Sequence, residues 1–177
     1  GFQNINIAVN VSSAQIHQQD VYGIIRKSLA EYGLEAHQLE IEITETALIQ
    51  DNNTAKNVLS QLREDGIKTW LDDFGTGYSS LSHLRSFSVS GVKIDQSFIH
   101  DIDTDENDQK LVSAILGLAH SLGIAVIAEG IETGQQLSRL TSAHCQFGQG
   151  YLFSRPVPLQ EFTELLADMK AGKWPGC

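Results

Sequence analysis

Two adjacent carboxylates interrupt an apolar run in the stretch WLDDFGTGYSSL, residues 70–81. Asp72 and Asp73 stand where a β-strand would end, and Gly75 and Gly77 directly after them allow the backbone to turn into a loop. Acids at a strand end can hold divalent cations, but the same residues also occur in a plain solvated turn. From this stretch alone, the solvated turn is the more common structure.

Similar polar residues stand at the ends of other apolar runs along the chain. They are Asn10, Glu42, Asp95, Glu129 and Gln149. If Glu42, Asp72, Asp73 and Glu129 converge with the amide oxygen of Asn10, the unpaired carboxylates repel one another, so a cation is expected among them. All-oxygen ligands favour Mg²⁺ or Mn²⁺ over zinc, and the adjacent pair Asp72–Asp73 suits two ions.

Two such ions about 3.5–4 Å apart can hold a phosphodiester for in-line attack by water and neutralise the leaving oxygen. The ammonium of Lys93 would then orient the water or stabilise developing charge. Simpler explanations remain open for each residue. Lys93 can be an exposed strand-end lysine, and Glu45, Glu129 and Glu132 can be first-turn acids favoured by a helix dipole. The recurrence of polar residues at successive strand ends, which turn formation does not require, favours a site.

The elements that position these residues follow from the hydrophobic period. Strands are predicted over residues 5–11, 39–44, 67–71, 92–94 and 124–128 and, more weakly, over residues 147–153. Helices are predicted between and after them, over residues 20–32, 55–64, 79–85, 107–122, 134–143 and 159–169. The chain therefore reads as six strand–helix units in a row.

Repeated βα units predict a parallel sheet, either open and doubly wound or closed into an eight-stranded barrel. In a barrel the carboxyl ends of the strands form one rim, whereas an open sheet spreads them along a line. The polar strand ends favour the barrel. Six units cannot close a ring of eight, so we predict an α/β TIM-type (β/α)8 barrel that lacks its first two βα units, with residues 1–177 as one domain.

Charge and composition exclude several classes of partner. The net charge of −10, from 12 basic and 22 acidic residues, argues against binding to duplex nucleic acid or to an anionic membrane surface. Two cysteines are too few for a disulfide scaffold, so a reducing, cytoplasmic setting is expected. The apolar stretch 111–128 contains polar residues and glycines and fits a helix followed by a strand better than a membrane span. The domain can still be the cytoplasmic part of a membrane-attached sensor protein.

Six segments of the chain resemble the EAL-domain phosphodiesterases, which open cyclic di-GMP to linear pGpG. They are AVNVS (8–12), LEIEITET (39–46), LDDFGTGYSSL (71–81), VKID (92–95), IAEGIET (127–133) and QGYLFSRP (149–156). The third and the sixth are the most specific. Together they run through nearly the whole chain in the order of the family, so the resemblance implies the same barrel, the same substrate and two metal ions.

The resemblance also implies roles for single residues. The residues similar to ligands of two Mg²⁺ or Mn²⁺ ions are Asn10, Glu42, Asp72, Asp73 and Glu129, with Asp72 bridging. Lys93 resembles the lysine beside the nucleophilic water, and Glu45 the acid that anchors the loop after Asp73. The catalytic candidates are then Lys93, Glu45 and Glu132. Gln149 resembles a residue of the same pocket, and Asp95 and Gln149 are the substrate-binding candidates.

Two departures from the family stand out. The Glu-Ala-Leu motif of the first strand and its nearby arginine are absent, which leaves the site one ligand short. Cys145-Gln146 stands where the family usually has Cys-Asp, a change expected to be peripheral.

Two functions from different classes remain open. In the first, the full-length parent hydrolyses cyclic di-GMP; in the second, an EAL-like module senses the dinucleotide or a partner protein without turnover. The filled rim positions favour the enzyme. Because open strand edges promote association, we expect the isolated 177 residues to form a homodimer or other self-association and to show little turnover.

Overall fold

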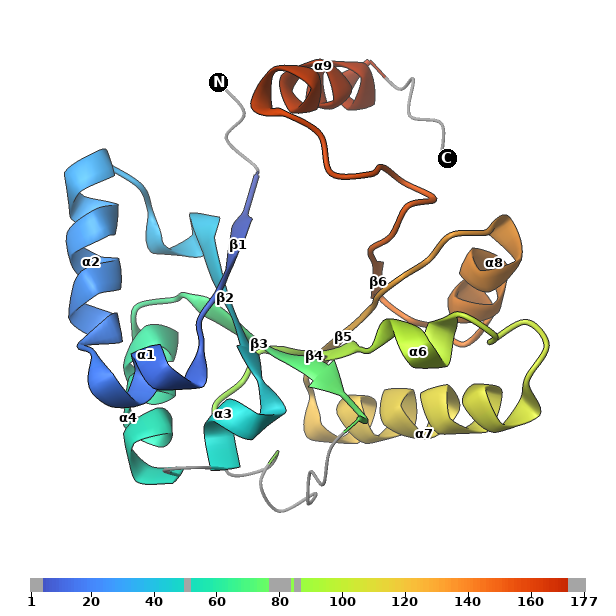
Figure 1. Cartoon of the computed structure of the whole chain (residues 1–177), viewed down its shortest axis with the longest axis horizontal. Helices are drawn as coiled ribbons and strands as arrows, with labels where there is room; N and C mark the ends of the chain where they lie inside the picture. The colour runs from blue at the N-terminus through green and yellow to red at the C-terminus, as the bar shows by residue number, and fades with distance from the viewer. Residues whose placement is uncertain (1–4, 50–51, 77–83, 85–86, 172–177) are drawn as a thin grey trace.

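The computed structural model describes residues 5–49, 52–76, 84 and 87–171. Six strands form one sheet whose spatial order is the chain order, and each neighbouring pair is parallel. The strands are β1 (Ile7–Asn10), β2 (Leu39–Thr44), β3 (Lys68–Phe74), β4 (Gly91–Ile94), β5 (Ala125–Ala128) and β6 (Phe147–Gly148). This is the winding of a βα barrel, and the curved sheet in Figure 1 forms part of one, as predicted.

The helices lie along the outside of the curved sheet, except the last one (Figure 1). They are α1 (Ser13–Gln18), α2 (Val21–Tyr32), α3 (Glu45–Ile49), α4 (Asn52–Glu64), α6 (Gln96–Ile99), α7 (Glu106–Leu122), α8 (Gly134–Ser142) and α9 (Leu159–Lys170), with a 3-10 turn at Ala36–Gln38. Helix α9 stands apart from the rest, and none of its residues is buried. Within the described ranges, no helix is both long and apolar enough to cross a membrane.

Apart from the helix over residues 79–85, the predicted elements are confirmed in kind, but several boundaries are wrong. The first strand is shorter than residues 5–11, and the third continues three residues past Leu71. The last strand ends at Gly148, because the chain turns at residues 151–153 instead of remaining extended. The short helices α1, α3 and α6 were not predicted, since four to six residues are too few to show a helical period. The predicted helix over residues 79–85 lies almost wholly outside the described residues.

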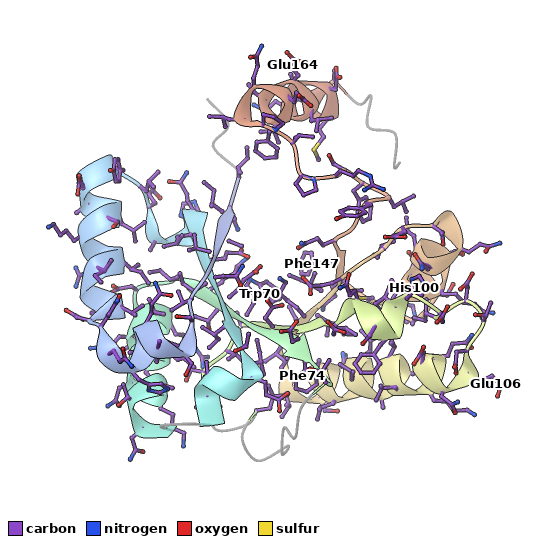
Figure 2. All side chains as sticks on the ribbon, viewed as in Figure 1. Trp70, Phe74, His100, Glu106, Phe147 and Glu164 are labelled. Carbon is purple, nitrogen blue, oxygen red and sulfur yellow. The ribbon has the colours of Figure 1, made fainter. Side chains whose placement is uncertain are left out.

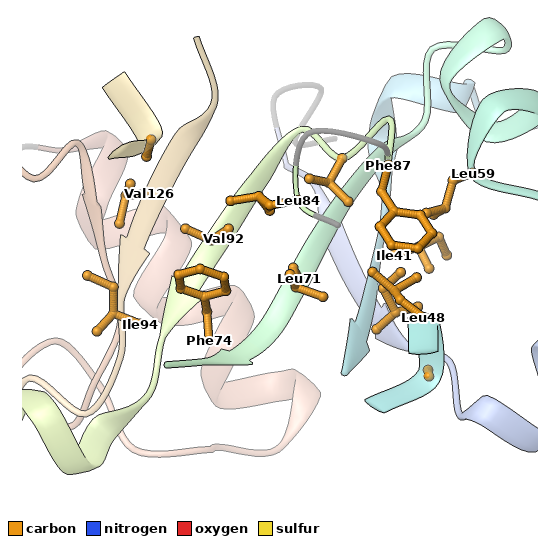
Figure 3. Packing of buried hydrophobic residues seen from close by; sticks show 14 of the residues in the cluster. Ile41, Leu48, Leu59, Leu71, Phe74, Leu84, Phe87, Val92, Ile94 and Val126 are labelled. Carbon is orange, nitrogen blue, oxygen red and sulfur yellow. The ribbon is translucent and has the colours of Figure 1, made fainter. Parts of the chain in front are cut away.

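Alternation along the strands places the core on one face of the sheet. Ile41 and Ile43 of β2, Leu71 of β3 and Val92 and Ile94 of β4 are each at most 2% exposed. They pack in one cluster with helix residues that include Ile16, Ile25, Leu59, Leu62, Val112, Ile115 and Leu140. Figure 3 shows part of this cluster, with Ile41, Leu71, Val92 and Val126 on the neighbouring strands β2 to β5. Burial of each such side chain is worth about 1.5–3 kcal/mol, so the outer face fixes the direction in which the side chains of the central strands point.

The alternate residues face the opposite, concave side of the sheet, and several of them are polar. The indole Nε1 of Trp70 donates a 2.6 Å hydrogen bond to Glu40, which also pairs with Lys68 at 3.3 Å. The ring of Trp70 meets Phe147 of β6 edge to face, with 6.3 Å between centroids (Figure 2). Trp70 and Phe147 thus connect the middle of the sheet to its last strand across the concave side.

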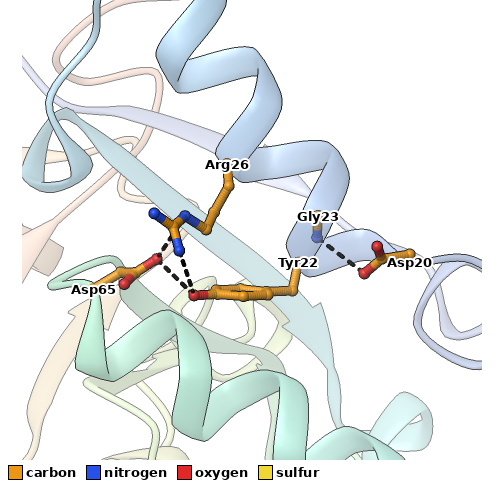
Figure 4. A network of polar contacts seen from close by, with 5 residues as sticks. All are labelled: Asp20, Tyr22, Gly23, Arg26 and Asp65. Atoms are coloured by element: carbon orange, nitrogen blue, oxygen red, sulfur yellow. Dashed lines mark hydrogen bonds and ion pairs between the residues drawn. The ribbon is translucent and has the colours of Figure 1, made fainter.

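A polar network attaches helix α2 to the turn between α4 and β3. The hydroxyl of Tyr22 donates to Asp65 at 3.0 Å, and the Arg26 guanidinium lies 3.6 Å from the same carboxylate (Figure 4). The carboxylate of Asp20 caps the helix by accepting from the backbone N–H of Gly23. The network fixes the first crossover helix against the third strand, which carries the Asp72–Asp73 pair.

Gly91 permits the close packing of Trp70 on the concave face, which leads to a stability prediction. A Cβ at Gly91 would overlap the Trp70 ring and lie 2.5 Å from the carbonyl oxygen of Ala125. Gly91→Ala should therefore lower the free energy of unfolding by about 1–3 kcal/mol in urea titrations followed by circular dichroism. Gly117→Ala, in helix α7 with no atom within 4 Å of the new Cβ, is the matched control and should raise it by up to about 1 kcal/mol. Equal behaviour of the two variants would contradict the packing argument.

Candidate active site

The carboxyl ends of the six strands carry the polar residues singled out in the sequence. Asn10 ends β1 and pairs in register with Glu42 of β2. Asp72 and Asp73 lie near the end of β3, while Asp95, Glu129 and Gln149 follow β4, β5 and β6 directly. The structure therefore brings these positions to one rim, as the barrel predicts.

A bulge in β3 explains how two adjacent acids reach the same site. Leu71 pairs with Val92 and Phe74 with Ile94, so β3 carries one residue more than β4 between these pairs. In a regular strand neighbouring side chains point to opposite faces, but the extra residue breaks this alternation. Asp73 has a left-handed backbone, φ 54°, which aspartate tolerates better than most residues. As a result, carboxylate oxygens of Asp72, Asp73 and Glu129 lie within 4.8 Å of one another.

Lys93 lies at the centre of this rim and is only 3% exposed. Its Nζ is 2.7 Å from Oε1 of Glu129, 2.8 Å from Oε2 of Glu42 and 3.3 Å from Oδ1 of Asp72. The alternative explanation, an exposed strand-end lysine, is therefore wrong. The three acids come from β2, β3 and the residue after β5, so the ammonium on β4 joins strands on both sides of it.

The electrostatics of the rim follow from burial and crowding. Burial alone lowers the pKa of Lys93, but hydrogen bonds to Glu129 and Glu42 outweigh it, and the pKa lies above its ordinary value. Burial raises the pKa of Glu129, and Asp72 and Glu42 add to this, although Lys93 opposes the shift. Desolvation, then Asp72 and Asp95, likewise raise the pKa of Asp73. The acids of the rim thus carry more negative charge than one lysine balances.

Glu45 is a second buried carboxylate of the site region. It is 6% exposed, and neither oxygen has a hydrogen-bond partner among the residues that the structure describes. It is also the first residue of α3, where a helix start favours an acid. The loop after Asp73 that it was expected to anchor, residues 77–83, lies outside the described residues, so this role stays a prediction.

A pocket of about 270 Å³ opens beside the acids and contains the other predicted positions. Its lining residues are Asp73, Asp95, Gln96, Glu129, Gly130, Glu132, Gln149, Gly150 and Tyr151. The carboxylate of Asp95 also caps α6 by accepting from the N–H of Ser97. Glu132 is exposed and precedes the N-cap residue Thr133 of α8, so it is not the first-turn acid that the simpler explanation requires.

Backbone contacts build the far wall of this pocket. The N–H of Gln149 donates to Ala128 at 2.8 Å, and Ile131 donates back to the carbonyl of Gln149 at 3.1 Å. A Cβ at Gly150 would overlap the backbone of Ile131, and Gly130, with φ 71°, lies so close to Gln96 that a Cβ would come within 2.5 Å of its side chain. These glycines bring the strand ends together, a function that the sequence motifs did not reveal.

Tyr151 was also missed as a wall residue. The guanidinium of Arg155 lies 4.3 Å from the centre of its ring, which is within the range of a cation–π contact. Both residues belong to the segment QGYLFSRP, whose specificity was the available signal.

The rim fits divalent metal ions by the chemistry of its donors. Carboxylate oxygens from three residues lie close together, and among the described residues Oδ1 of Asp72 is buried with an ion pair but no hydrogen bond. Hard oxygen donors of this kind suit Mg²⁺ or Mn²⁺. The arrangement can therefore hold cations that would in turn hold an anionic substrate.

Comparison with known proteins relates the sequence of this chain to one family. The family model of the EAL domain matches residues 1–156. A curated relative from Pseudomonas aeruginosa, "Cyclic di-GMP phosphodiesterase NbdA", is 42% identical over 166 residues, which are 94% of this chain and 21% of the relative. The chain thus spans about a fifth of the length of that relative, and of "Signaling protein YkoW" from Bacillus subtilis.

Solved structures of other proteins are similar to this chain in both fold and sequence. The "PaMucR Phosphodiesterase, c-di-GMP complex" superposes with a TM-score of 0.87 at 38% identity, over 92% of this chain and 66% of that one. A Klebsiella pneumoniae BlrP1 complex with manganese and cyclic di-GMP gives a TM-score of 0.79 at 37% identity, over 85% of this chain and 39% of that one.

The raised pKa of Asp73 predicts how stability depends on pH in the metal-free chain. Its ionised form is less favourable in the folded than in the unfolded state, so Asp73→Asn should raise the unfolding temperature at pH 8. The gain should shrink as the pH falls through the folded pKa and vanish below the ordinary value of 3.8, where the carboxyl is neutral in both states. Since Asp73 is exposed, the effect should stay below about 1 kcal/mol.

Thermal unfolding in EDTA at several pH values measures this effect. Asp65→Asn, which removes the partner of Arg26 and Tyr22, is the control and should give no gain at pH 8. A gain for Asp73→Asn that is the same at every pH would contradict the electrostatic explanation.

Proposed function

Because the chain belongs to the EAL domain family, we propose that its rim binds two Mg²⁺ or Mn²⁺ ions and, in the complete protein, hydrolyses cyclic di-GMP to pGpG. The observation that carries the proposal is the cluster of three carboxylates, Asp72 and Asp73 from β3 and Glu129 after β5, beside the buried Lys93. The names of NbdA and of the PaMucR complex supply the substrate.

The metal ligands in this proposal are Asn10, Glu42, Asp72, Asp73 and Glu129. When bound, the ions would lower the pKa of a water molecule and neutralise the phosphate oxygens. Asp72 shares the carboxylate cluster with Asp73 and Glu129 and lies 3.3 Å from Lys93, and in this proposal it would be a ligand of both ions. Without cations the pocket would repel the phosphates of the dinucleotide, because its walls carry Asp73, Asp95, Glu129 and Glu132.

The residues of the chain would share the remaining work. Lys93 would orient the attacking water and stabilise charge that develops on the phosphoryl oxygens. Gln149 and Asp95, which both line the pocket, would hold the substrate, and Glu132 lines the same pocket. Glu45, buried at the start of α3, would position the loop that follows Asp73. The reaction adds the water oxygen to phosphorus and breaks one ester bond, which leaves a linear dinucleotide.

We also propose that residues 1–177 are the C-terminal part of such a domain and lack its first two βα units. Among the described residues, β1 and β6 each pair on one side only. Apolar side chains on and beside these strands are exposed, including Ile7 at 60% and Phe147 at 55%. Two further strands between β1 and β6 would cover them and close the barrel.

The activity test compares this chain with a version that carries the family's first two βα units. With cyclic di-GMP and Mn²⁺, the restored protein should release pGpG, measured by chromatography, and the 177-residue chain should release little. Asp73→Ala in the restored protein should reduce the rate by about 10²-fold or more, because a ligand at the reacting phosphate is lost. Asp103→Ala, in the turn before α7, serves as the control and should keep full activity. Binding without cleavage by the restored protein would instead indicate a receptor.

The open edges predict self-association of the isolated chain. Light scattering coupled to size exclusion should give a mass above the 19.4 kDa of one chain. Ile7→Lys, which places a charge on the edge strand β1, should shift the population toward monomer. A monomeric wild-type chain with full turnover would overturn this proposal.

A further inference from the structure

The contacts of Lys93 go beyond what the positioning of a water molecule requires. Its ammonium is buried and lies within 3.3 Å of three carboxylates, those of Glu42, Asp72 and Glu129. These acids are themselves only 11–17% exposed at the side chain. They come from β2, β3 and the end of β5, so the Lys93 side chain is the point at which the strand ends meet.

The acids need a counter-charge whether or not a metal ion is bound. Several carboxylates held together away from water repel one another, and each of them is costly to bury unpaired. One ammonium carries three donors, and here it is hydrogen-bonded to Glu129 and Glu42 and forms an ion pair with Asp72. The hydrogen-bond distances to Glu129 and Glu42 match charge-assisted bonds of the stronger kind.

We propose that Lys93 is the built-in counter-ion of the site: its ammonium holds Glu42, Asp72 and Glu129 together in the metal-free protein, and divalent cations compete with it for the same oxygens. This rests on the metal site of the proposed function but adds a separate role, because it concerns the folded state before metal, water or substrate is bound. The rim is then already assembled when the first cation arrives.

Competition gives the proposal a signature that a purely structural lysine lacks. Removal of the ammonium should destabilise the metal-free chain, because the acids lose their counter-charge. The same change should tighten metal binding, because the oxygens no longer have to leave Lys93 and the site becomes more negative. If Lys93 served only packing, its replacement would lower the stability of the metal-free chain and also weaken metal binding.

The variants separate charge from packing. Lys93→Met keeps an unbranched apolar stem and removes the charge. Lys68→Met is the matched control, since Lys68 lies on the same sheet but is half exposed and pairs with the single carboxylate of Glu40 at 3.3 Å. The double variant Lys93→Met/Glu129→Gln removes one negative charge together with the positive one.

The experiment measures thermal unfolding in EDTA and Mn²⁺ binding by isothermal titration calorimetry. Lys93→Met should unfold several degrees below the wild type and Lys68→Met, and the double variant should recover part of this loss. Lys93→Met should bind Mn²⁺ about tenfold or more tightly than the wild type, and Lys68→Met should bind as the wild type does. If Lys93→Met does not fold in EDTA, added Mn²⁺ should restore its circular dichroism spectrum.

Three results would overturn the proposal. They are unchanged stability of Lys93→Met in EDTA, Mn²⁺ binding by Lys93→Met that is no tighter than that of the wild type, and a double variant no more stable than Lys93→Met. A wild-type chain that binds no Mn²⁺ would refute the proposed metal site, while the comparison in EDTA would still decide whether Lys93 is the counter-ion.

Discussion

A buried ion cluster at the ends of the strands sets the constraint on which the rim depends. Lys93 forms ion pairs with acids from β2, β3 and the end of β5, and burial of these carboxylates is costly without a cation nearby. The cluster also couples strands that are not direct neighbours, since Glu42 reaches Lys93 across β3. The same charged residues therefore hold the strand ends together and supply the groups of the proposed site.

Apolar packing elsewhere in the sheet offsets the cost of burying this ion cluster. The outer faces of β2, β3, β4 and β5 carry apolar residues that pack against the helices, and this burial fixes the orientation of every second side chain in these strands. The polar residues must then face the concave side, where strand ends converge. A regular β3 would send Asp72 and Asp73 to opposite faces; the bulge and the left-handed backbone of Asp73 bring both to the same one. The left-handed backbone of Asp73 thus adds its carboxylate to those of Asp72 and Glu129.

The concave side of the sheet is well packed in its middle and exposed at its two outermost strands. Glu40, Trp70 and Phe147 fill part of the interior, and Gly91 leaves room for the indole ring. The two outermost strands, by contrast, keep apolar side chains in solvent. The rim residues from β2 to β6 are held by contacts within the chain, whereas the apolar side chains of β1 and β6 remain exposed.

Local patterns in the sequence predicted much of the architecture and the identity of the rim. Apolar runs marked all six strands, and polar residues at the ends of these runs marked the rim, because core packing does not require them there. The same patterns could not give the ends of β3 and β6 or the short helices α1, α3 and α6, which capping and turn contacts decide over a few residues.

Tertiary structure alone decided how the charges are shared. The sequence indicated four acids and a lysine, but it did not show that Lys93 is buried among three of them, or that Gly130 and Gly150 bring the pocket walls together. Such distances depend on the curvature of the sheet and the stagger of its strands, and these result from contacts over the whole chain. The residue types therefore determined what chemistry was available, and the packing of the sheet determined which groups could meet to perform it.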